Sequence, residues 1–269
     1  MSGVRRVLRV HAGGRTAWHS DELTTEEPLE IRVNNRAVSV TMRTPGADFD
    51  LAVGFLVTEG VIDGADDIVS MRMCPNAAEG DALNVVEVTL RDDTLRTPQR
   101  AFYTTSSCGI CGKASIDAVR TASRYEVRDD PLRMTPALLA TLPPRQREAQ
   151  KVFARTGGLH AAALFDAAGE LVCLREDVGR HNAFDKVIGW AATQRRLPLR
   201  SHVILASGRA SFELTQKALM AGIPVIAAVS APSQLAVDLA RESGMTLIGF
   251  LRGEQMNVYT GQERIALSA

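Results

Sequence analysis

The sequence predicts an α/β fold for the C-terminal part of the chain. From Val152 onward, short apolar strand candidates alternate with helix candidates, and Gly222 and Gly244 stand where a glycine commonly ends a helix. The expected strands are 159–165, 171–175, 203–206, 225–229 and 247–250, and the expected helices cover about 182–194 and the segments ending at Ala221 and Ser243. Strands that alternate with helices pair in parallel through right-handed crossovers, with helices covering the sheet.

The first hundred residues predict a β-rich N-terminal part with one helix. Segments 3–11 and 29–43 alternate between apolar and polar residues, and Asn34-Asn35 is typical of a tight turn. Pro45-Gly46 interrupts the chain before a helix expected over 48–59, and Gly60 follows that helix. Two further strands are expected at 68–73 and 84–90. The strands of residues 1–100 could also join the sheet of the second part.

Residues 101–150 predict a connection between these two parts. They begin with a C-x-x-C stretch over 104–113, followed by a polar helix candidate over 114–123. The segment 124–150 contains four prolines and many charges, which predicts short surface helices. We therefore divide the chain into 1–100, 101–150 and a ligand-binding α/β domain over 151–269.

Composition indicates an ordinary globular protein of the reducing cytoplasm. Basic and acidic residues balance at 31 each, so net charge does not favour nucleic acid or an anionic membrane as a partner. No run approaches the roughly 20 apolar residues of a membrane span, and residues 1–7 lack the apolar block of a secretory signal. Four cysteines do not form a disulfide framework in a chain of this length, and Cys74 and Cys173 are expected in the core.

Polar residues follow each strand of the predicted parallel sheet. Ligands of such sheets bind beyond the carboxyl ends of the strands. Small residues there allow backbone N–H groups to approach an anion, and arginines add charged donors, so a phosphate-bearing ligand fits. The competing interpretation is that Ser, Gly and Asn at these points are only helix caps and turns. The candidate binding residues are Arg180, His181, Ser207, Gly208, Arg209, Ser230, Phe250, Leu251, Arg252, Gly253, Glu254 and Gln255.

The sequence does not decide the roles of two histidines and one oppositely charged pair near these loops. His181 could contact a phosphate or a base, or could hold its own loop, and His160 is equally open. Asp177 and Lys186 are candidates for an ion pair that orders the loop between them. We do not assign either histidine to catalysis.

Cys108 and Cys111 form the C-x-x-C pair, and three functional hypotheses compete with a buried, inert pair. A structural zinc site normally needs four ligands, yet no second pair exists, and the H-x-E motif of zinc deaminases is absent. A thiol–disulfide oxidoreductase would place the pair after a strand and at the start of a helix. A nucleophilic sulfur carrier would be favoured by Lys113 and by a helix N-terminus that stabilise a thiolate. Residues 107–114 imitate a P-loop but lack its first glycine and its final Ser or Thr.

Several motifs together resemble the formate dehydrogenase accessory sulfurtransferases. The matching segments are 105–112 (TSSCGICG), 156–160 (TGGLH), 176–186 (EDVGRHNAFDK), 207–209 (SGR), 230–232 (SAP) and 257–260 (NVYT). The segment 176–186 is long and distinctive, and the motifs extend from about residue 100 to the C-terminus.

This resemblance implies a concrete function. It implies a sulfur carrier that accepts sulfur from a cysteine desulfurase as a persulfide on Cys108, assisted by Cys111. The sulfur then passes to the molybdenum of a bis-molybdopterin guanine dinucleotide cofactor before the cofactor enters formate dehydrogenase. It also implies a homodimer, a cytidine-deaminase-like three-layer αβα domain beside a smaller N-terminal α+β domain, and cofactor contacts at 250–255. A cofactor-binding chaperone that transfers no sulfur and a thiol–disulfide oxidoreductase are the alternatives.

Overall fold

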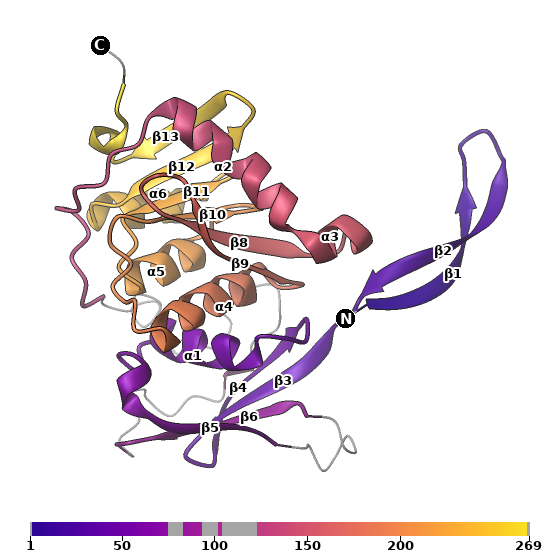
Figure 1. Ribbon diagram of the computed structural model, residues 1–269, viewed down its shortest axis with the longest axis horizontal. Helices are drawn as coiled ribbons and strands as arrows, with labels where there is room; N and C mark the ends of the chain where they lie inside the picture. Colours follow the sequence, from indigo (N-terminus) through magenta and orange to yellow (C-terminus); the bar gives the residue numbers. More distant parts are fainter. Residues whose placement is uncertain (1, 75–82, 93–101, 104–122, 268–269) are drawn as a thin grey trace.

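The computed structural model describes residues 2–74, 83–92, 102–103 and 123–267. These residues form a six-stranded sheet, a five-stranded sheet and a separate two-stranded ribbon, with helices packed on and between the larger sheets (Figure 1). The fold is therefore mixed α/β, as predicted. Among these residues, no helix combines the length and apolar character needed to cross a membrane.

The six-stranded sheet is the centre of the C-terminal part, with strand order β13-β12-β11-β10-β8-β9. Its strands are β8 (His160–Phe165), β9 (Leu171–Asp177), β10 (Val203–Ala206), β11 (Val225–Ala228), β12 (Thr246–Arg252) and β13 (Gln255–Thr260). The predicted parallel pairing holds for β10, β11 and β12. The β8–β9 hairpin pairs antiparallel to β10, and β13, which was not predicted, pairs antiparallel to β12.

Helices lie on both faces of this sheet. The helices α4 (Arg180–Thr193), α5 (Phe212–Met220) and α6 (Gln234–Glu242) lie on one side, and α2 (Pro136–Ala149), followed by α3 (Lys151–Thr156), lies on the other (Figure 1). The prediction of short surface helices over 124–150 is wrong for α2, which is one helix of 14 residues containing Pro143 and Pro144. Buried Leu139 and Leu142 hold α2 against Phe165 of the sheet, and this burial offsets the backbone hydrogen bonds that the prolines remove.

The N-terminal part forms a five-stranded sheet with strand order β5-β6-β3-β4-β7. Its strands are β3 (Glu27–Val33), β4 (Arg36–Arg43), β5 (Ile68–Cys74), β6 (Val85–Leu90) and β7 (Phe102–Tyr103). A short 3-10 helix, η1 (Ala65–Asp67), precedes β5, and another, η3 (Gln262–Arg264), lies near the C-terminus. Asn34 and Asn35 both have positive φ angles, of 48° and 62°, as the predicted tight turn requires. The helix α1 (Asp48–Thr58) ends before Gly60, whose φ is +73°.

Residues 2–24 form a ribbon of β1 (Ser2–Val10) and β2 (Thr16–Thr24). The strand β1 was predicted and β2 was not. The ribbon extends away from the rest of the molecule as a long projection (Figure 1).

The helices α1 and α4 connect the two larger sheets, and two glycines allow their backbones to touch. A Cβ atom placed on Gly54 would lie 1.8 Å from the carbonyl oxygen of Asp185 in α4. A Cβ atom placed on Gly189 of α4 would lie 1.8 Å from the carbonyl oxygen of Asp50. No side chain fits at either position, so the helices can approach this closely only if both residues are glycine.

We expect Gly189→Ala to lower the free energy of unfolding by about 3 kcal/mol or more, because the new methyl group meets backbone that has to move as a unit. Chemical denaturation followed by circular dichroism measures this change. Gly13→Ala is the matched control, because a Cβ atom there meets nothing within 4 Å and the change should stay within about 0.5 kcal/mol. Equal stability of the two variants would contradict the contact.

Candidate functional site

Backbone hydrogen bonds join the loops that follow β10 and β11 to each other and to the end of β12. The amide of Ser230 donates to the carbonyl of Gly208 at 3.3 Å, and the amide of Phe250 donates to the carbonyl of Ser230 at 3.1 Å. The hydroxyl of Ser207 accepts a hydrogen bond from the amide of Ala161 at 2.8 Å. These two loops and the end of β12 therefore form one continuous surface at the carboxyl ends of the parallel strands.

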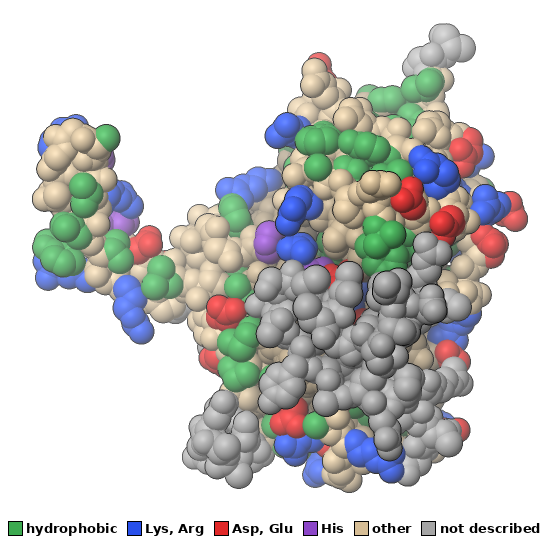
Figure 2. Space-filling view, turned by 180° about the vertical axis from the view of Figure 1, so that it is seen from behind, with side chains coloured by type: hydrophobic (Ala, Val, Ile, Leu, Met, Phe, Trp, Pro, Cys, Tyr) green, Lys and Arg blue, Asp and Glu red, His purple; other side chains and the backbone are tan. Residues whose placement is uncertain are grey.

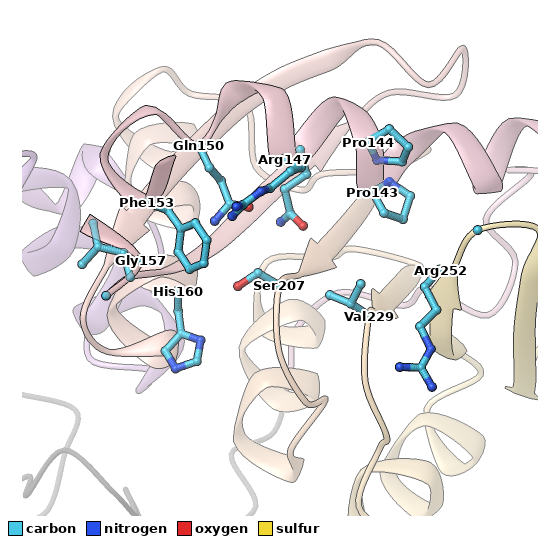
Figure 3. A pocket seen from close by; sticks show the side chains of 14 residues that line it. Pro143, Pro144, Arg147, Gln150, Phe153, Gly157, His160, Ser207, Val229 and Arg252 are labelled. Atoms are coloured by element: carbon cyan, nitrogen blue, oxygen red, sulfur yellow. The ribbon is translucent and has the colours of Figure 1, made fainter. Parts of the chain in front are cut away.

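A cavity of about 620 Å³ opens beside this surface (Figure 3). This volume lies within the usual range for small-molecule sites. Ser207 and Val229 come from the strand ends, His160 from the start of β8, and Arg252 from the end of β12. The remaining lining residues come mostly from α2, α3 and the turn after them: Pro143, Pro144, Gln146, Arg147, Gln150, Phe153, Gly157, Gly158, Leu159 and Gly253.

The turn between β12 and β13 separates this cavity from a smaller hollow of about 240 Å³. Arg252 lines both, whereas Phe250 and Gln255 line only the smaller one. Phe250 has a φ angle of 52°, a left-handed conformation that is rare for an aromatic residue and is associated with functional sites. The guanidinium of Arg252 lies 5.7 Å from the centre of the Phe250 ring.

Asp177 organises the loop that begins α4. Its side chain is fully buried and lies 2.7 Å from the ammonium of Lys186, so the proposed loop-ordering ion pair is present. One carboxylate oxygen also accepts from the amide of Gly179 at 2.8 Å and from the side chain of Asn182 at 3.0 Å. The other accepts from the amide of Thr44 at 3.1 Å. Burial of a charge is tolerated only with such partners, so the start of α4 is rigidly placed.

His181 and Glu213 pair across the starts of α4 and α5. Nε2 of His181 lies 2.7 Å from Oε2 of Glu213, and both side chains are less than one fifth exposed. Burial alone would raise the pKa of Glu213, but His181, Lys217 and Arg180 together lower it, so this carboxylate stays ionised. His181 is thus engaged within the protein, which favours its role in holding the loop.

His160 lies on the cavity side of this pair. Its ring packs against Gly208, where an added Cβ atom would lie 3.5 Å from Nδ1. Burial lowers the pKa of His160, and the charges of Arg180 and His181 lower it further against the opposing effect of Asp177. The cavity therefore presents a neutral imidazole with positive charge behind it. Nε of Arg180 is itself buried and has no hydrogen-bond partner among the described residues.

The structure thus assigns different surroundings to the predicted binding residues. Ser207, Arg252 and Gly253 line the larger cavity, and Gly208 supports His160. Arg209 and Glu254 are exposed, and Leu251 is fully buried in the core, so its side chain cannot reach a ligand. Cys108 and Cys111 lie outside the described residues. Among the residues that are described, no group of three or more His, Cys, Asp or Glu side chains could hold a metal ion.

Sequence reasoning missed the wall built by α2 and α3. Arg147 stacks on Phe153 at 4.1 Å from the ring centre, and both carboxylate oxygens of Glu176 accept backbone amides at the start of α3, at 2.7 and 3.0 Å. The motif 156–160 was the available signal, because its two glycines and His160 line the cavity directly after this wall. The proline-rich composition of α2 gave no such indication.

The two other cysteines differ from each other. Cys173 is buried in β9, and burial raises the pKa of its thiol to about 11, as expected for an inert core residue. Cys74 ends β5 and is only partly buried. The core prediction is therefore confirmed for Cys173 and wrong for Cys74.

We expect the imidazole of His160 to titrate below its usual pKa of 6.5, and Arg180→Gln to raise that pKa because it removes a neighbouring positive charge. Protonation of His160 is less favourable in the folded protein than in the unfolded chain, so its contribution to stability is fully present above about pH 6.5. The free energy of unfolding then decreases as the pH falls from 6.5 through the lowered pKa of the folded protein. Proton NMR titration measures the pKa, and His160→Gln assigns the resonance. Titration above pH 6.5, or no response to Arg180→Gln, would contradict this assignment.

Comparison with known proteins identifies the family of the chain. The family model described as FdhD/NarQ family matches residues 24–266. A sulfur carrier protein FdhD from Streptomyces avermitilis is 58% identical over 274 residues, which cover 98% of this chain and 96% of that protein. The sulfur carrier protein FdhD of Mycolicibacterium paratuberculosis is 58% identical over 267 residues, covering 97% of each chain.

A known crystal structure has the same fold. It is of a protein from Desulfotalea psychrophila described as a formate dehydrogenase accessory protein, with a TM-score of 0.77, 24% sequence identity, and coverage of 98% of this chain and 99% of that one. Its likeness supports the fold alone. The family match and the two relatives show, over nearly the whole chain, that this protein belongs to the FdhD/NarQ family.

Proposed function

We propose that this protein is a sulfur carrier required for formate dehydrogenase activity. The observation that carries the proposal is 58% identity over 98% of the chain to a sulfur carrier protein FdhD. The C-x-x-C pair of Cys108 and Cys111 supplies the chemistry such a carrier needs. The proposed partners are a cysteine desulfurase as sulfur donor and formate dehydrogenase as recipient, with the carrier acting as a cytoplasmic homodimer.

In the proposed reaction, the Cys108 thiolate attacks the outer sulfur of a persulfide on the desulfurase, whose own thiolate leaves. Cys108 then carries the sulfur as a persulfide. Delivery as sulfide needs two electrons, which Cys111 supplies when its thiolate attacks the inner sulfur and a Cys108–Cys111 disulfide forms. A thiol reductant restores the pair. The recipient is the molybdenum of a bis-molybdopterin guanine dinucleotide, which is the substrate of the transfer.

The cavity supports a ligand of this kind. Arg147 and Arg252 are donors suited to phosphate, and the backbone of the Gly157–Gly158 turn lies at the same wall. The neutral His160 can accept a hydrogen bond from a base or a sugar hydroxyl. One such cavity in each copy of a homodimer would match a cofactor that carries two guanine nucleotides. We also infer that the six-stranded sheet with helices on both faces is the cytidine-deaminase-like arrangement expected from the sequence.

A cofactor-binding chaperone that transfers no sulfur is the second candidate. One observation favours it: Arg147 and Arg252, two of the described residues that line the cavity, carry groups that bind phosphate, and neither belongs to the C-x-x-C stretch. The cavity could therefore bind its ligand without either Cys108 or Cys111. The two candidates differ in whether sulfur becomes covalently attached to the chain.

We expect the wild-type chain to gain the mass of one sulfur atom after incubation with a cysteine desulfurase and cysteine. Intact-mass spectrometry measures this gain, and the reductant dithiothreitol should remove it. Cys108→Ser should abolish the gain, whereas Cys173→Ser is the matched control and should retain it, because the Cys173 thiol is buried. A sulfur gain that survives Cys108→Ser would refute the assignment of Cys108. Activation of formate dehydrogenase by a Cys108→Ser/Cys111→Ser variant would favour the chaperone.

We expect Arg252→Gln to weaken the binding of guanosine 5′-monophosphate tenfold or more, because a hydrogen bond to a charged group contributes roughly 1.5–3 kcal/mol. Isothermal titration calorimetry measures the dissociation constant. Arg195→Gln is the control, since that side chain is 77% exposed and pairs only with the equally exposed Asp66 in the described structure. Equal affinity of the two variants would remove Arg252 from the proposed site.

A further inference from the structure

The β1–β2 ribbon, residues 2–24, forms an arm with an uncovered apolar face. Val4, Leu8, Val10 and Trp18 are 49–64% exposed. Leu8 lies directly opposite Trp18, and Val4 and Val10 are at alternate positions of the same strand, so the four side chains share one face. Arg6 lies on this face as well, with its guanidinium 4.9 Å from the centre of the Trp18 ring. Figure 2 shows apolar and basic side chains together along this projection.

The arm is fixed to the body at its root. The hydroxyl of Thr24 donates to the hydroxyl of Thr156 at 2.9 Å, and Arg155 lies 3.4 Å from Glu22. Beyond the root, β1 and β2 pair only with each other among the described residues. An isolated two-stranded ribbon is marginally stable in water and exposes two strand edges, so a ribbon of this length needs a surface to pack on.

Charge indicates what that surface is. The arm, residues 2–24, contains four arginines and two acidic residues, Asp21 and Glu22, whereas the other 246 residues contain 27 basic and 29 acidic side chains. The arm therefore carries a net charge of +2 and the remainder −2 at neutral pH, with histidines neutral, and both acidic residues lie near the root of the arm. The body of a second copy thus attracts the arm, whereas two arms packed on each other would bring eight arginines together.

The dimensions of the arm fit such an exchange. Strands of nine residues are about 30 Å long, and a two-stranded ribbon is about 10 Å wide, so one face covers roughly 300 Å². Two arms exchanged about a two-fold axis would bury on the order of 1,200 Å² in total, which reaches the range of stable protein interfaces.

We propose that the arm is an exchange element: in a dimer, the apolar face of each arm packs on the body of the other copy. Sulfur transfer is not required for this contact, so its test is independent of the proposed function. The root of the arm adjoins the cavity, because Gly158 lines the cavity and an added Cβ atom there would lie 2.6 Å from the Thr24 hydroxyl. The contact between copies would therefore begin at the cavity rim.

We expect sedimentation equilibrium of the full chain at tens of micromolar to give twice the chain mass of 29.0 kDa. Leu8→Ser/Trp18→Ser should raise the dimer dissociation constant on the order of 100-fold, because central apolar and aromatic residues dominate interface energy. The control Val69→Ser removes a side chain of similar exposure, 60%, from β5 and should leave the dimer intact. Unchanged thermal unfolding at a concentration where every variant is monomeric verifies folding. A monomeric wild type, or a dimer unaffected by the double variant, would overturn the proposal.

A charge-reversed arm decides between the two possible arrangements of a dimer. In Arg5→Glu/Arg6→Glu/Arg9→Glu the arm is acidic. If arms pack on bodies, this variant loses dimer affinity by itself and gains no tight association when mixed with the wild type. A mixed dimer tighter than the wild-type dimer would show that arms pack on each other, and would overturn the exchange.

Discussion

The direct backbone contact between α1 and α4 holds the two parts of this protein together. The helix α1 covers the five-stranded sheet, and α4 covers the six-stranded sheet, so their separation sets the distance between the sheets (Figure 1). Gly54 and Gly189 make that separation as small as backbone atoms allow. One continuous apolar core runs from Ile31 of the N-terminal sheet, through both helices, to Ile204 of the C-terminal sheet. The two parts therefore share one core, and the packing of that core determines their relative position.

Buried charges fix the register of this contact. Lys217 of α5 lies 2.9 Å from Asp185 of α4, which also accepts a hydrogen bond from Thr58 of α1 at 2.8 Å. Burial alone would lower the pKa of Lys217, but Asp185 and Glu59 raise it above its usual value, so the ammonium keeps its proton. Removing one partner of such a pair typically costs about 3–5 kcal/mol, so a shifted packing of the three helices is strongly disfavoured. Asp177 and Lys186 extend the same principle to the loop at the site.

Local signals predicted the elements well where each element depends on its own sequence. The apolar strands β10, β11 and β12 and the glycines after their helices indicated a parallel α/β arrangement, which the structure confirms. The elements that were missed depend on distant partners. The polar strand β2 forms because it pairs with β1, and α2 tolerates two prolines because Leu139 and Leu142 are buried against the sheet. The close backbone contact between Gly54 and Asp185 depends on both helices at once, so the sequence of either helix alone does not predict it.

The candidate site shows the same division. The rule that ligands bind at the carboxyl ends of parallel strands led to Ser207, Arg252 and Gly253, which line the cavity. The opposite wall comes from α2 and α3, on the other face of the sheet, and no rule about strand ends includes it.

The short helix α3 is the point where the cavity and the arm meet. Its first turn is held by the carboxylate of Glu176, its residue Phe153 lines the cavity, and its last residue, Thr156, holds the root of the arm. Glu176 belongs to β9, so α3 and the root of the arm are anchored to the sheet and not to a loop. The proposed contact between copies and the proposed ligand site are therefore both attached to α3, a helix of six residues that Glu176 anchors to the sheet.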